Sequence, residues 1–215
     1  MKIALIGYGK MGHMIEEVAL ERGHEIVARI DVGDAFDLKG AQVAIEFTTP
    51  LTAEGNILRA WAQGVPVVCG TTGWDVLKVK GERLKVKGDN SGVIMEDESG
   101  KTMLVWKSNY SVGVNIFFEL NKFLAQSIQH SGVPYQPSIK EIHHIHKLDK
   151  PSGTAKTLAE QIGTEVAIES VREGEVPGTH EVTWDSEEDT IIITHIAKGR
   201  RGFALGAVLA AEQFV

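Results

Sequence analysis

The chain has 215 residues, a net charge of −7 and 43% hydrophobic residues, which indicates a globular protein of one large or two small domains. The acidic balance argues against nonspecific nucleic-acid binding, and no apolar run approaches the roughly 20 residues of a membrane-spanning helix. Cys69 is the only cysteine, so no internal disulfide can form, and the N-terminal stretch is not a signal peptide. We therefore expect a cytoplasmic protein that binds neither nucleic acid nor membrane.

The first 31 residues carry the pattern of a dinucleotide-binding unit. The stretch "KIALIG" (2–7) predicts a buried parallel strand, "HMIEEVALERG" (13–23) a helix, and "HEIVARID" (24–31) a second strand. Between the first strand and the helix, "GYGKMG" has the spacing G-x-G-x-x-G, and Asp31 lies 19 positions beyond Gly12. Strand, glycine turn, helix, strand and acid in this order are the dinucleotide fingerprint, whereas the glycine motif alone could be a simple turn.

Each part of this motif has a physical role. Gly7 permits the tight turn, Gly9 lets a pyrophosphate approach the backbone, and Gly12 lets helix and strand pack closely. The start of the helix directs N–H donors at the diphosphate, and Asp31 can accept hydrogen bonds from the adenine ribose. The motif therefore predicts a nicotinamide dinucleotide as cofactor.

The surroundings of Asp31 bear on the choice of cofactor. A carboxylate repels the 2′-phosphate of NADPH, and the next residue, Val32, is not basic. Arg29 is expected on the same strand face, and it and Lys10 could partly offset the repulsion. We expect both NADH and NADPH to be used, with NADH modestly preferred.

Two more strands are predicted before residue 74. The first is "QVAIEFTTP" (42–50), in which Thr49 caps a helix over 51–64 and Pro50 suits its first turn. The second is "VPVVCGTTG" (65–73), where Cys69 is interpreted as a buried core residue. Ligands of open parallel sheets bind beyond the carboxyl ends of the strands, so "GYGKMG", "EFTTP" and "CGTTG" should lie at the binding edge.

Residues 75–101 have a less regular pattern. A helix can begin at Asp75, but Gly81 and Gly88 weaken it, and "DNSG" and "DESG" predict turns on either side of a short strand. The repeated "LKVKG" is interpreted as chance or as a solvated basic face. The next stretch, "TMLVWKSNYS" (102–111), predicts a strand followed by a polar turn.

The second half mixes helices and strands. An amphipathic helix is predicted over 112–132, a strand over 137–146 and a helix over 153–166. Two antiparallel strands with a turn at "SEED" follow in "HEVTWDSEEDTIIITHIA", and "GFALGAVLAAEQFV" predicts a last helix. The apolar face of the helix at 112–132 is expected to comprise Val114, Phe117, Phe118, Leu120 and Leu124.

The fold class is therefore α/β. We expect an N-terminal Rossmann-type dinucleotide-binding domain at 1–108 and a smaller α+β substrate-binding and oligomerisation domain with a mixed sheet at 109–202. The helix at 203–215 is expected to pack back on the first domain.

The stretch "EIHHIHKLDKPSGTA" (141–155) contains three of the eight histidines. By spacing alone, two or three of His143, His144 and His146 could ligate zinc. Strand alternation turns the first away from the other two, no Cys is nearby and no H-E-x-x-H motif occurs, so we predict no metal. Histidines without a role on a half-exposed strand are a second interpretation. A third is catalytic, because His143 and Lys147 are four apart and share a face on a strand and roughly so on a helix. Histidine can donate a proton near neutral pH, and lysine supplies a cation or second acid.

The turn that follows favours the catalytic interpretation. Ser152, Gly153 and Thr154 open the predicted helix and present N–H and hydroxyl donors, which suit a carboxylate. A proton donor, a cation and a carboxylate cradle fit a small acidic substrate beside a nicotinamide.

The same stretch resembles the E-x-H-H-x-x-K-x-D-x-P-S-G-T-A signature of the dihydrodipicolinate reductase family. The stretches "GYGKMG", "EFTTP", "CGTTGW", "SNYSVGVN" and "THIAKGRRGFALGA" also occur in that family's order, so the resemblance covers nearly the whole chain. Ile145 stands where members often carry arginine, and Lys150 where alanine is common. The resemblance implies NAD(P)H-dependent reduction of 4-hydroxy-tetrahydrodipicolinate (dihydrodipicolinate) to tetrahydrodipicolinate in lysine and diaminopimelate biosynthesis, by a homotetramer.

The resemblance also implies roles for individual residues. The catalytic pair is His143 and Lys147, and Arg200 and Phe203 match the C-terminal motif, for which a solvated basic turn is an equal alternative. The substrate would be held by His144, Ser152, Gly153 and Thr154. The cofactor would be held by Gly7, Tyr8, Gly9, Lys10, Met11, Gly12, Asp31, Gly70, Thr71, Thr72, Lys107, Ser108, Asn109 and Tyr110.

Two other functions compete with this prediction. One is a different nicotinamide dehydrogenase, such as an aspartate dehydrogenase. The other is a dinucleotide-sensing module without catalysis, which would not need His143 and Lys147.

Overall fold

The computed structural model describes residues 1–79, 84–89 and 92–214, and the chain divides into two compact units. Unit 1 comprises Met1–Ser111 and Arg201–Val215, and unit 2 comprises Val112–Arg200. Among the described helices, none has both the length and the apolar character needed to cross a membrane.

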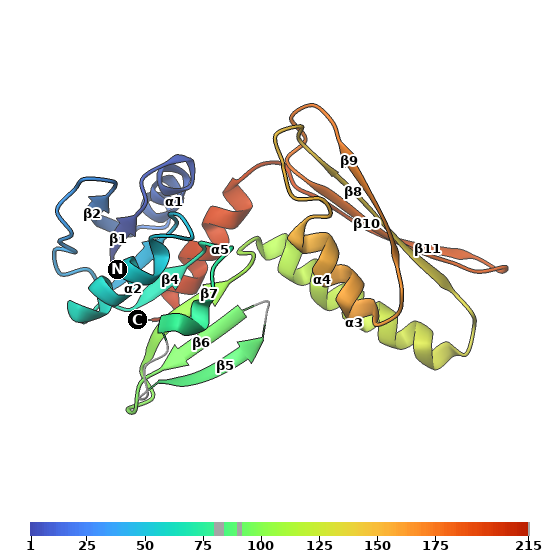
Figure 1. The fold of residues 1–215 in the computed structure, drawn as a ribbon, viewed down its shortest axis with the longest axis horizontal. Coiled ribbons are helices and arrows are strands. Elements are labelled where there is room, and N and C mark those ends of the chain that lie inside the picture. Colours follow the sequence, from blue (N-terminus) through green and yellow to red (C-terminus); the bar gives the residue numbers. More distant parts are fainter. Residues whose placement is uncertain (80–83, 90–91, 215) are drawn as a thin grey trace. The chain divides into compact units, whose positions relative to one another are not determined.

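Unit 1 is built on a single sheet. Its described elements along the chain are β1 (Lys2–Ile6), α1 (Lys10–Glu21), β2 (Glu25–Ile30), β3 (Val43–Glu46), α2 (Ala53–Ala62), β4 (Val67–Cys69), the short 3₁₀ helix η1 (Val76–Val79), β5 (Lys85–Asp89), β6 (Gly92–Glu96), β7 (Thr102–Lys107) and α5 (Arg201–Glu212). The seven strands lie in the order β2-β1-β3-β4-β7-β6-β5 (Figure 1). The first five are parallel, and β6 and β5 are antiparallel to their neighbours.

In the parallel part of this sheet, the strands β1, β3 and β4 are buried on both faces. Along β1, Ile3 and Leu5 pack with α1 and α5, whereas Ala4 and Ile6 pack with α2 and η1. Successive strand residues point to opposite faces, so a continuous apolar strand requires cover on both sides. The Rossmann-type prediction is confirmed.

Helix α5 completes one of these two layers. It contacts α1 and the strands β3 and β4. At Gly206 a side chain would collide with the Tyr110 carbonyl, so helix and strand connection approach closely. The returning helix therefore belongs to the core of unit 1.

Unit 2 is a second, mixed sheet covered by helices on one face (Figure 1). Its elements are α3 (Val112–Ser131), β8 (Gln136–His143), α4 (Gly153–Ile162), β9 (Ala167–Arg172), β10 (Thr179–Asp185) and β11 (Thr190–Ile196). The strand order is β11-β10-β8-β9, in which only the β8–β9 pair is parallel. Side chains of α3 and α4 and one face of the sheet form its core. The mixed sheet and the antiparallel pair with its turn at "SEED" are confirmed.

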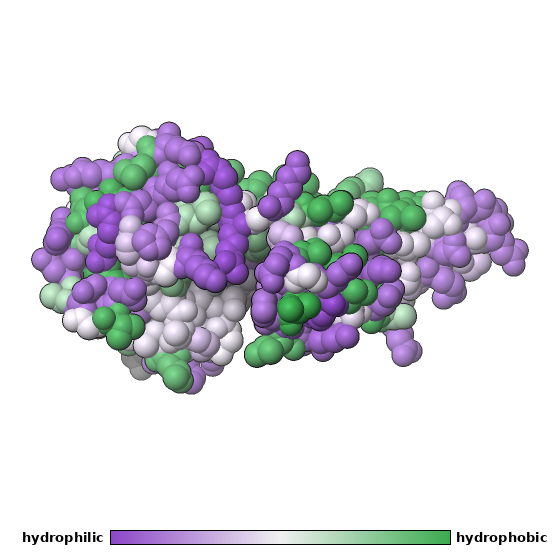
Figure 2. All heavy atoms as spheres, turned by 90° about the horizontal axis from the view of Figure 1, so that it is seen from above, coloured by the Kyte–Doolittle hydropathy of each residue, from purple (hydrophilic) through white to green (hydrophobic). Residues whose placement is uncertain are grey.

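The surface mixes hydrophilic and hydrophobic groups, as Figure 2 shows for one face. On α3, Ile116 and Phe123 are 65% and 68% exposed. The prediction that Leu120 faces inward is wrong: its side chain is 45% exposed. The neighbouring Asn121 takes the buried position instead. The helix thus turns its buried face slightly from the predicted one.

Several element boundaries differ from prediction. Helix α2 begins at Ala53 and not near Pro50, because residues 50–52 form a turn in which the Thr52 and Ala53 N–H groups donate to the Thr49 carbonyl. The helix predicted from Asp75 is only the single turn η1. The second "LKVKG" lies largely in β5, and the turn predicted at "DNSG" includes residues 90 and 91, which lie outside the described residues.

Strand β9 was not predicted at all. Its apolar residues Ile168 and Val171 are three apart, so the stretch lacks the two-residue alternation of a half-buried strand. It pairs with β8 through its backbone. Tertiary pairing therefore decided this element.

Candidate functional site

The glycine turn after β1 has the shape that a dinucleotide site needs. Gly7 has a φ of +91°, and its N–H donates to the Ile30 carbonyl at 2.8 Å. A side chain at Gly7 would collide with the Phe47 backbone, and one at Gly12 would collide with the Gly7 carbonyl. Both positions therefore require glycine.

Gly9 leaves the space beside the first turn of α1 open. It is the N-cap of α1, and no described residue comes within 4 Å of the place where its Cβ would lie. Because glycine has no capping side chain, the first N–H groups of α1 remain for an anionic ligand. Lys10 is exposed at this helix start, and Met11 is partly buried. This geometry fits the pyrophosphate of a nicotinamide dinucleotide.

Asp31 follows β2 and is exposed. Its Oδ1 accepts the Val32 N–H at 2.9 Å. Arg29 is not a free cation near it: its Nε donates to both Glu16 oxygens at 3.0 and 3.1 Å, its Nη2 also bonds Glu16, and the Tyr8 hydroxyl donates to the same carboxylate. The hydrogen bonds from Arg29 lower the pKa of Glu16. No sequence signal pointed to Glu16.

Glu46, at the end of β3, joins the turns after β3 and β4. It is fully buried, and its carboxylate accepts hydrogen bonds from Thr71 Oγ1 at 2.8 Å, from Cys69 Sγ at 3.0 Å and from Thr48 Oγ1. Burial and this carboxylate raise the pKa of the Cys69 thiol, which fits a core residue. The sequence motifs predict no role for Glu46, although an acidic residue at the end of an apolar strand is a signal for one.

The loop after β4 is also shaped by packing. A side chain at Gly70 would collide with the Phe47 ring. Thr71 is buried, and its carbonyl accepts the indole N–H of Trp74 and that of Trp106, both at 2.8 Å. Thr72 is exposed, so it remains available to a ligand.

The segment 107–110 is split between surface and core. Lys107 ends β7 and Ser108 is exposed. The Asn109 Oδ1 accepts the Ser111 N–H at 2.8 Å. Tyr110 is 4% exposed, and its hydroxyl donates to the Val105 carbonyl at 2.8 Å. The Tyr110 side chain is thus a core group, and only its backbone is left to meet a ligand.

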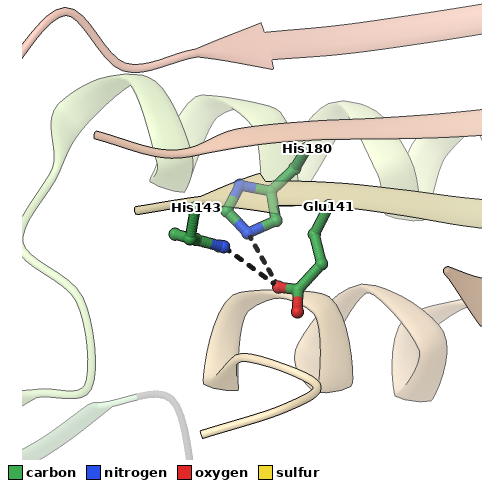
Figure 3. A group of neighbouring side chains, drawn as sticks. All are labelled: Glu141, His143 and His180. Carbon is green, nitrogen blue, oxygen red and sulfur yellow. Dashed lines mark ion pairs between the residues drawn. The ribbon is translucent and has the colours of Figure 1, made fainter. Parts of the chain in front are cut away.

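In unit 2, the end of β8 carries the histidine predicted to be catalytic. His143 is the last strand residue and is 6% exposed. Glu141 lies on the same strand face, and His180 is its cross-strand neighbour on β10. The Glu141 Oε2 is 3.4 Å from His143 Nδ1 and 3.8 Å from His180 Nε2 (Figure 3). Gly178 leaves room for the imidazole, since a Cβ there would lie 3.1 Å from His143 Nε2.

The charge state of His143 follows from this environment. Burial lowers the pKa of His143, and so do the positive charges of Lys147 and Arg172, while Glu141 and Asp149 raise it. The net direction is downward from the ordinary value. A bound dianion would favour the protonated imidazole and raise this pKa again.

The residues after His143 are not a strand. They form a turn in which the Lys147 N–H donates to the His144 carbonyl at 3.1 Å. The predicted strand alternation of His143, His144 and His146 is therefore wrong, as is the shared strand face of His143 and Lys147. From His144 the chain leaves the sheet and runs through residues 144–152 to the start of α4. His146 is exposed, with its Nε2 3.1 Å from Glu175, and His144 is half-buried.

The start of α4 has the predicted donors. Ser152 is the N-cap, and its Oγ accepts the Ala155 N–H at 3.2 Å and lies 3.2 Å from His180 Nε2. At 2% exposed, Ser152 is engaged within the protein. Gly153 is exposed and Thr154 is half-buried, so these two positions face outward most.

Arg172, the last residue of β9, was missed because β9 itself was missed. Its Nη2 donates to Glu141 Oε1 at 3.2 Å and to the Asp149 carbonyl at 2.5 Å, and its Nε donates to the Lys147 carbonyl at 3.2 Å. It therefore links the strand to the loop before α4.

Glu141, His143 and His180 could hold a metal ion by spacing alone, since one ligand atom from each lies within 4.8 Å of the others. The carboxylate, however, already accepts the Ser152 N–H at 3.1 and 3.2 Å and pairs with the Arg172 cation. A divalent ion at this place would be repelled by the Arg172 guanidinium. The arrangement fits an ion-pair network better than a metal centre.

Comparison with known proteins identifies relatives over the whole length. A family model described as "Dihydrodipicolinate reductase, N-terminus" matches residues 1–98, and one described as "Dihydrodipicolinate reductase, C-terminus" matches 113–215. A 4-hydroxy-tetrahydrodipicolinate reductase of Christiangramia forsetii is 44% identical, over 99% of this chain and 91% of its own. One of Thermosipho africanus is 33% identical, over 99% and 90%.

A solved structure described as dipicolinate-bound dihydrodipicolinate reductase from Paenisporosarcina sp. TG-14 has a similar fold. Its TM-score is 0.74 at 20% identity, over 100% of this chain and 94% of its own. At that identity the likeness supports the fold.

Proposed function

The chain belongs to the dihydrodipicolinate reductase family, and we propose that it reduces 4-hydroxy-tetrahydrodipicolinate to tetrahydrodipicolinate in lysine and diaminopimelate biosynthesis. The observation that carries this proposal is the relative of 44% identity, aligned over 99% of the chain, whose name states that activity. NADH or NADPH, when bound, supplies the hydride. The glycine turn of unit 1 and the His143 region of unit 2 each fit their part of this reaction.

Residues of unit 2 supply the proton, stabilise the developing charge and bind the substrate. His143 donates the proton that completes the reduction, and Lys147 stabilises the charge that develops. His144 and the start of α4, with Gly153 and Thr154, hold the substrate carboxylates. Ser152 supports this helix start as its cap.

In unit 1 the cofactor is held mainly by backbone groups. The N–H donors that open α1 bind the diphosphate, and Asp31 binds the adenine ribose. The proposed contacts are Gly7, Tyr8, Gly9, Lys10, Met11, Gly12, Asp31, Gly70, Thr71, Thr72, Lys107, Ser108, Asn109 and the backbone of Tyr110.

The direct test is an assay with enzymatically generated substrate in which the oxidation of NADH or NADPH is followed by absorbance. We expect oxidation that depends on both protein and substrate. Cofactor binding without oxidation would favour a sensing module. Reduction of NAD⁺ with L-aspartate, without turnover of the dicarboxylate, would favour an aspartate dehydrogenase.

We further propose a modest preference for NADH. Asp31 is exposed at the end of β2, and Arg29 is held by Glu16, so that cation does little to offset the repulsion of a 2′-phosphate. Replacing Asp31→Ser, or freeing Arg29 with Glu16→Gln, should shift kcat/KM toward NADPH. A shift of about 5–30-fold corresponds to one or two kcal/mol.

The measurement is kcat/KM for each cofactor at fixed ionic strength, because salt screens exposed charges. Glu17→Gln, the same change one position along α1 and on an exposed side chain, is the matched control. A wild-type preference for NADPH would overturn the proposed role of Asp31.

We also propose that the protein is a cytoplasmic homotetramer. Family membership supports this assembly, and unit 2 leaves both edge strands of its sheet, β11 and β9, without a strand neighbour among the described residues. Light scattering should give four times the 23.4 kDa chain mass. A mass of one chain at assay concentration would contradict it.

A further inference from the structure

Glu141 and Arg172 form a buried ion pair inside unit 2. The Glu141 side chain is fully buried, the Arg172 side chain is 14% exposed, and Nη2 lies 3.2 Å from Oε1. The same carboxylate accepts the backbone N–H of Ser152. Glu141 is also two residues before His143 on β8.

The pair holds both ends of the loop that runs from Lys147 to Ser152. Arg172 binds the carbonyls of Lys147 and Asp149, at 3.2 and 2.5 Å, and Glu141 binds the N–H of Ser152. This loop carries the Lys147 ammonium at one end and leads into α4 at the other. The pair thereby connects both Lys147 and the start of α4 to β8, the strand that ends at His143.

Stability alone does not account for such a pair. Buried ion pairs are weak evidence for stability, because desolvation offsets most of the attraction, and an apolar pair of similar volume often stabilises as well. Burial raises the pKa of Glu141, but hydrogen bonds from Ser152, Ser170 and Arg172 outweigh it and leave that pKa below its ordinary value. The carboxylate is ionised at neutral pH, so its fixed directional bonds set the loop geometry.

We propose that Glu141 and Arg172 are positioning residues for the reduction: they fix the loop 147–152 so that Lys147 and the start of α4 take one geometry about His143. The inference rests on the proposed function and deepens it. Both residues act through the groups that they hold.

The test compares Glu141→Gln, Arg172→Gln and the double variant with the wild type. Glu141→Gln keeps an oxygen for the Ser152 N–H but removes the charge. We expect kcat/KM to fall by on the order of 10²-fold, the effect of misplacing reacting groups by about 1 Å. Affinity for pyridine-2,6-dicarboxylate, a ring dicarboxylate analogue, should fall as well, while NADH affinity stays within twofold.

The matched control is Glu169→Gln. Glu169 is on β9 and pairs with Lys140 on β8 at 3.4 Å, across the same two strands, but both side chains are exposed. It receives the same chemical change and should keep wild-type turnover. Loss of turnover in this control equal to that in Glu141→Gln would overturn the proposal.

The double variant separates positioning from folding. Either single change leaves a buried charge unpaired and is expected to lower the urea midpoint, whereas the double change removes both charges. We expect the double variant to regain stability but not kcat/KM or analogue affinity. Recovery of activity together with stability would show a structural role only and would overturn the proposal.

The pH dependence of kcat/KM is a further measurement, and a purely structural role of the pair would leave it unchanged. The charged and titratable groups that face His143 are Glu141, Lys147, Asp149, Arg172 and His180. Because protonated His143 is the proton donor, kcat/KM falls as pH rises through its pKa. Glu141→Gln should move this fall to lower pH and Arg172→Gln to higher pH. Unmoved profiles in both variants would overturn the proposal.

Failure of the proposed function is distinguishable from failure of this inference. A wild type without turnover contradicts the function. Analogue binding still tests the pair in that case: the inference predicts loss in Glu141→Gln and retention in Glu169→Gln.

Discussion

His143 and Lys147, the two residues proposed to be catalytic, come from different local structures: His143 ends β8 and Lys147 follows the turn after it. The charge of Lys147 is among the causes that lower the pKa of His143, so the two groups interact electrostatically. A neutral histidine that gains a proton near a bound dianion can then deliver it to the substrate. Their proposed roles depend on this coupling.

Replacing His143→Ala should lower kcat by about 10²–10⁴-fold, the usual effect of removing a positioned proton donor. Lys147→Ala should lower it also. NADH affinity, measured by fluorescence titration, should stay nearly constant, because the proposed cofactor residues lie in unit 1. His146→Ala is the control, since that histidine is exposed, forms an ion pair with Glu175 and, among the described residues, otherwise only meets the His144 ring at a centroid distance of 6.0 Å. A wild-type rate in His143→Ala would remove the assignment.

His180 shows how the buried site couples to stability. Burial, with the neighbouring His143, lowers the pKa of His180 to about 4, and its side chain is 5% exposed. The unfolded chain, with an ordinary histidine, therefore binds more protons between about pH 6.5 and 4. The free energy of unfolding must fall as pH falls through this window, and it keeps its full value above pH 6.5.

We expect the free energy of unfolding, measured with urea, to drop between pH 7 and pH 5, with His180 contributing on the order of 3 kcal/mol over its whole window. His180→Gln cannot be protonated and should flatten this dependence. His130→Gln, at an exposed histidine of α3, should not. An equal slope in wild type and His180→Gln would contradict the assignment.

At the scale of elements, the first turn of α4 is the part of unit 2 that we propose to hold the substrate carboxylates. Ser152 is the N-cap of α4, and the Ser152 N–H donates a hydrogen bond to the Glu141 carboxylate. Gly163 ends the helix in the left-handed conformation with a φ of 76°. Such a helix start presents N–H donors and a positive dipole end, which together bind carboxylates. Thr154 adds a hydroxyl in the same turn.

Replacing Thr154→Ala should raise the KM for the dicarboxylate by about 5–30-fold, which corresponds to one or two kcal/mol. NADH binding should change little. Pyridine-2,6-dicarboxylate should compete with the substrate in the wild type and bind more weakly in the variant. Thr157→Ala, the same change one turn later on α4, is the control. Absence of competition in the wild type would contradict a carboxylate site at this helix.

At the scale of the whole molecule, unit 1 is made from two separate stretches of chain. Helix α5 returns after unit 2 and packs with α1 on one face of the sheet. The chain leaves unit 1 after Ser111 and returns to it at Arg201. These two places are close together, because a Cβ on Gly202 would lie 3.7 Å from Ser111 Oγ. Unit 2 is therefore an insertion whose ends almost meet on unit 1.

A chain that joins residues 1–111 to 201–215 through a short Gly-Ser linker should fold and bind NADH. Residues 1–111 alone should not, because one face of the sheet would lose its α5 cover and expose apolar side chains of the core. Circular dichroism and NADH titration check both. Folded, NADH-binding 1–111 would contradict a structural role of α5.

The sequence by itself determined the local parts of this protein. The glycine spacing predicted the turn after β1 because only glycine adopts a φ of +91° without strain and allows the close approach at Gly12. Strong periodicity predicted α1, α3, α4, α5 and the β10–β11 hairpin. Family signatures marked His143, Lys147 and Thr154, all within one short stretch.

Only the tertiary structure decided what joins distant stretches. Strand β9 has a weak pattern of its own and forms because β8 offers a partner, and with it come Arg172 and the ion pair to Glu141, 31 positions away in the chain. Glu46 and Arg29 likewise take their partners, Thr71 and Glu16, from other elements. Periodicity and motifs describe a residue's near neighbours in the chain, whereas a buried charge is defined by groups that only folding brings into reach.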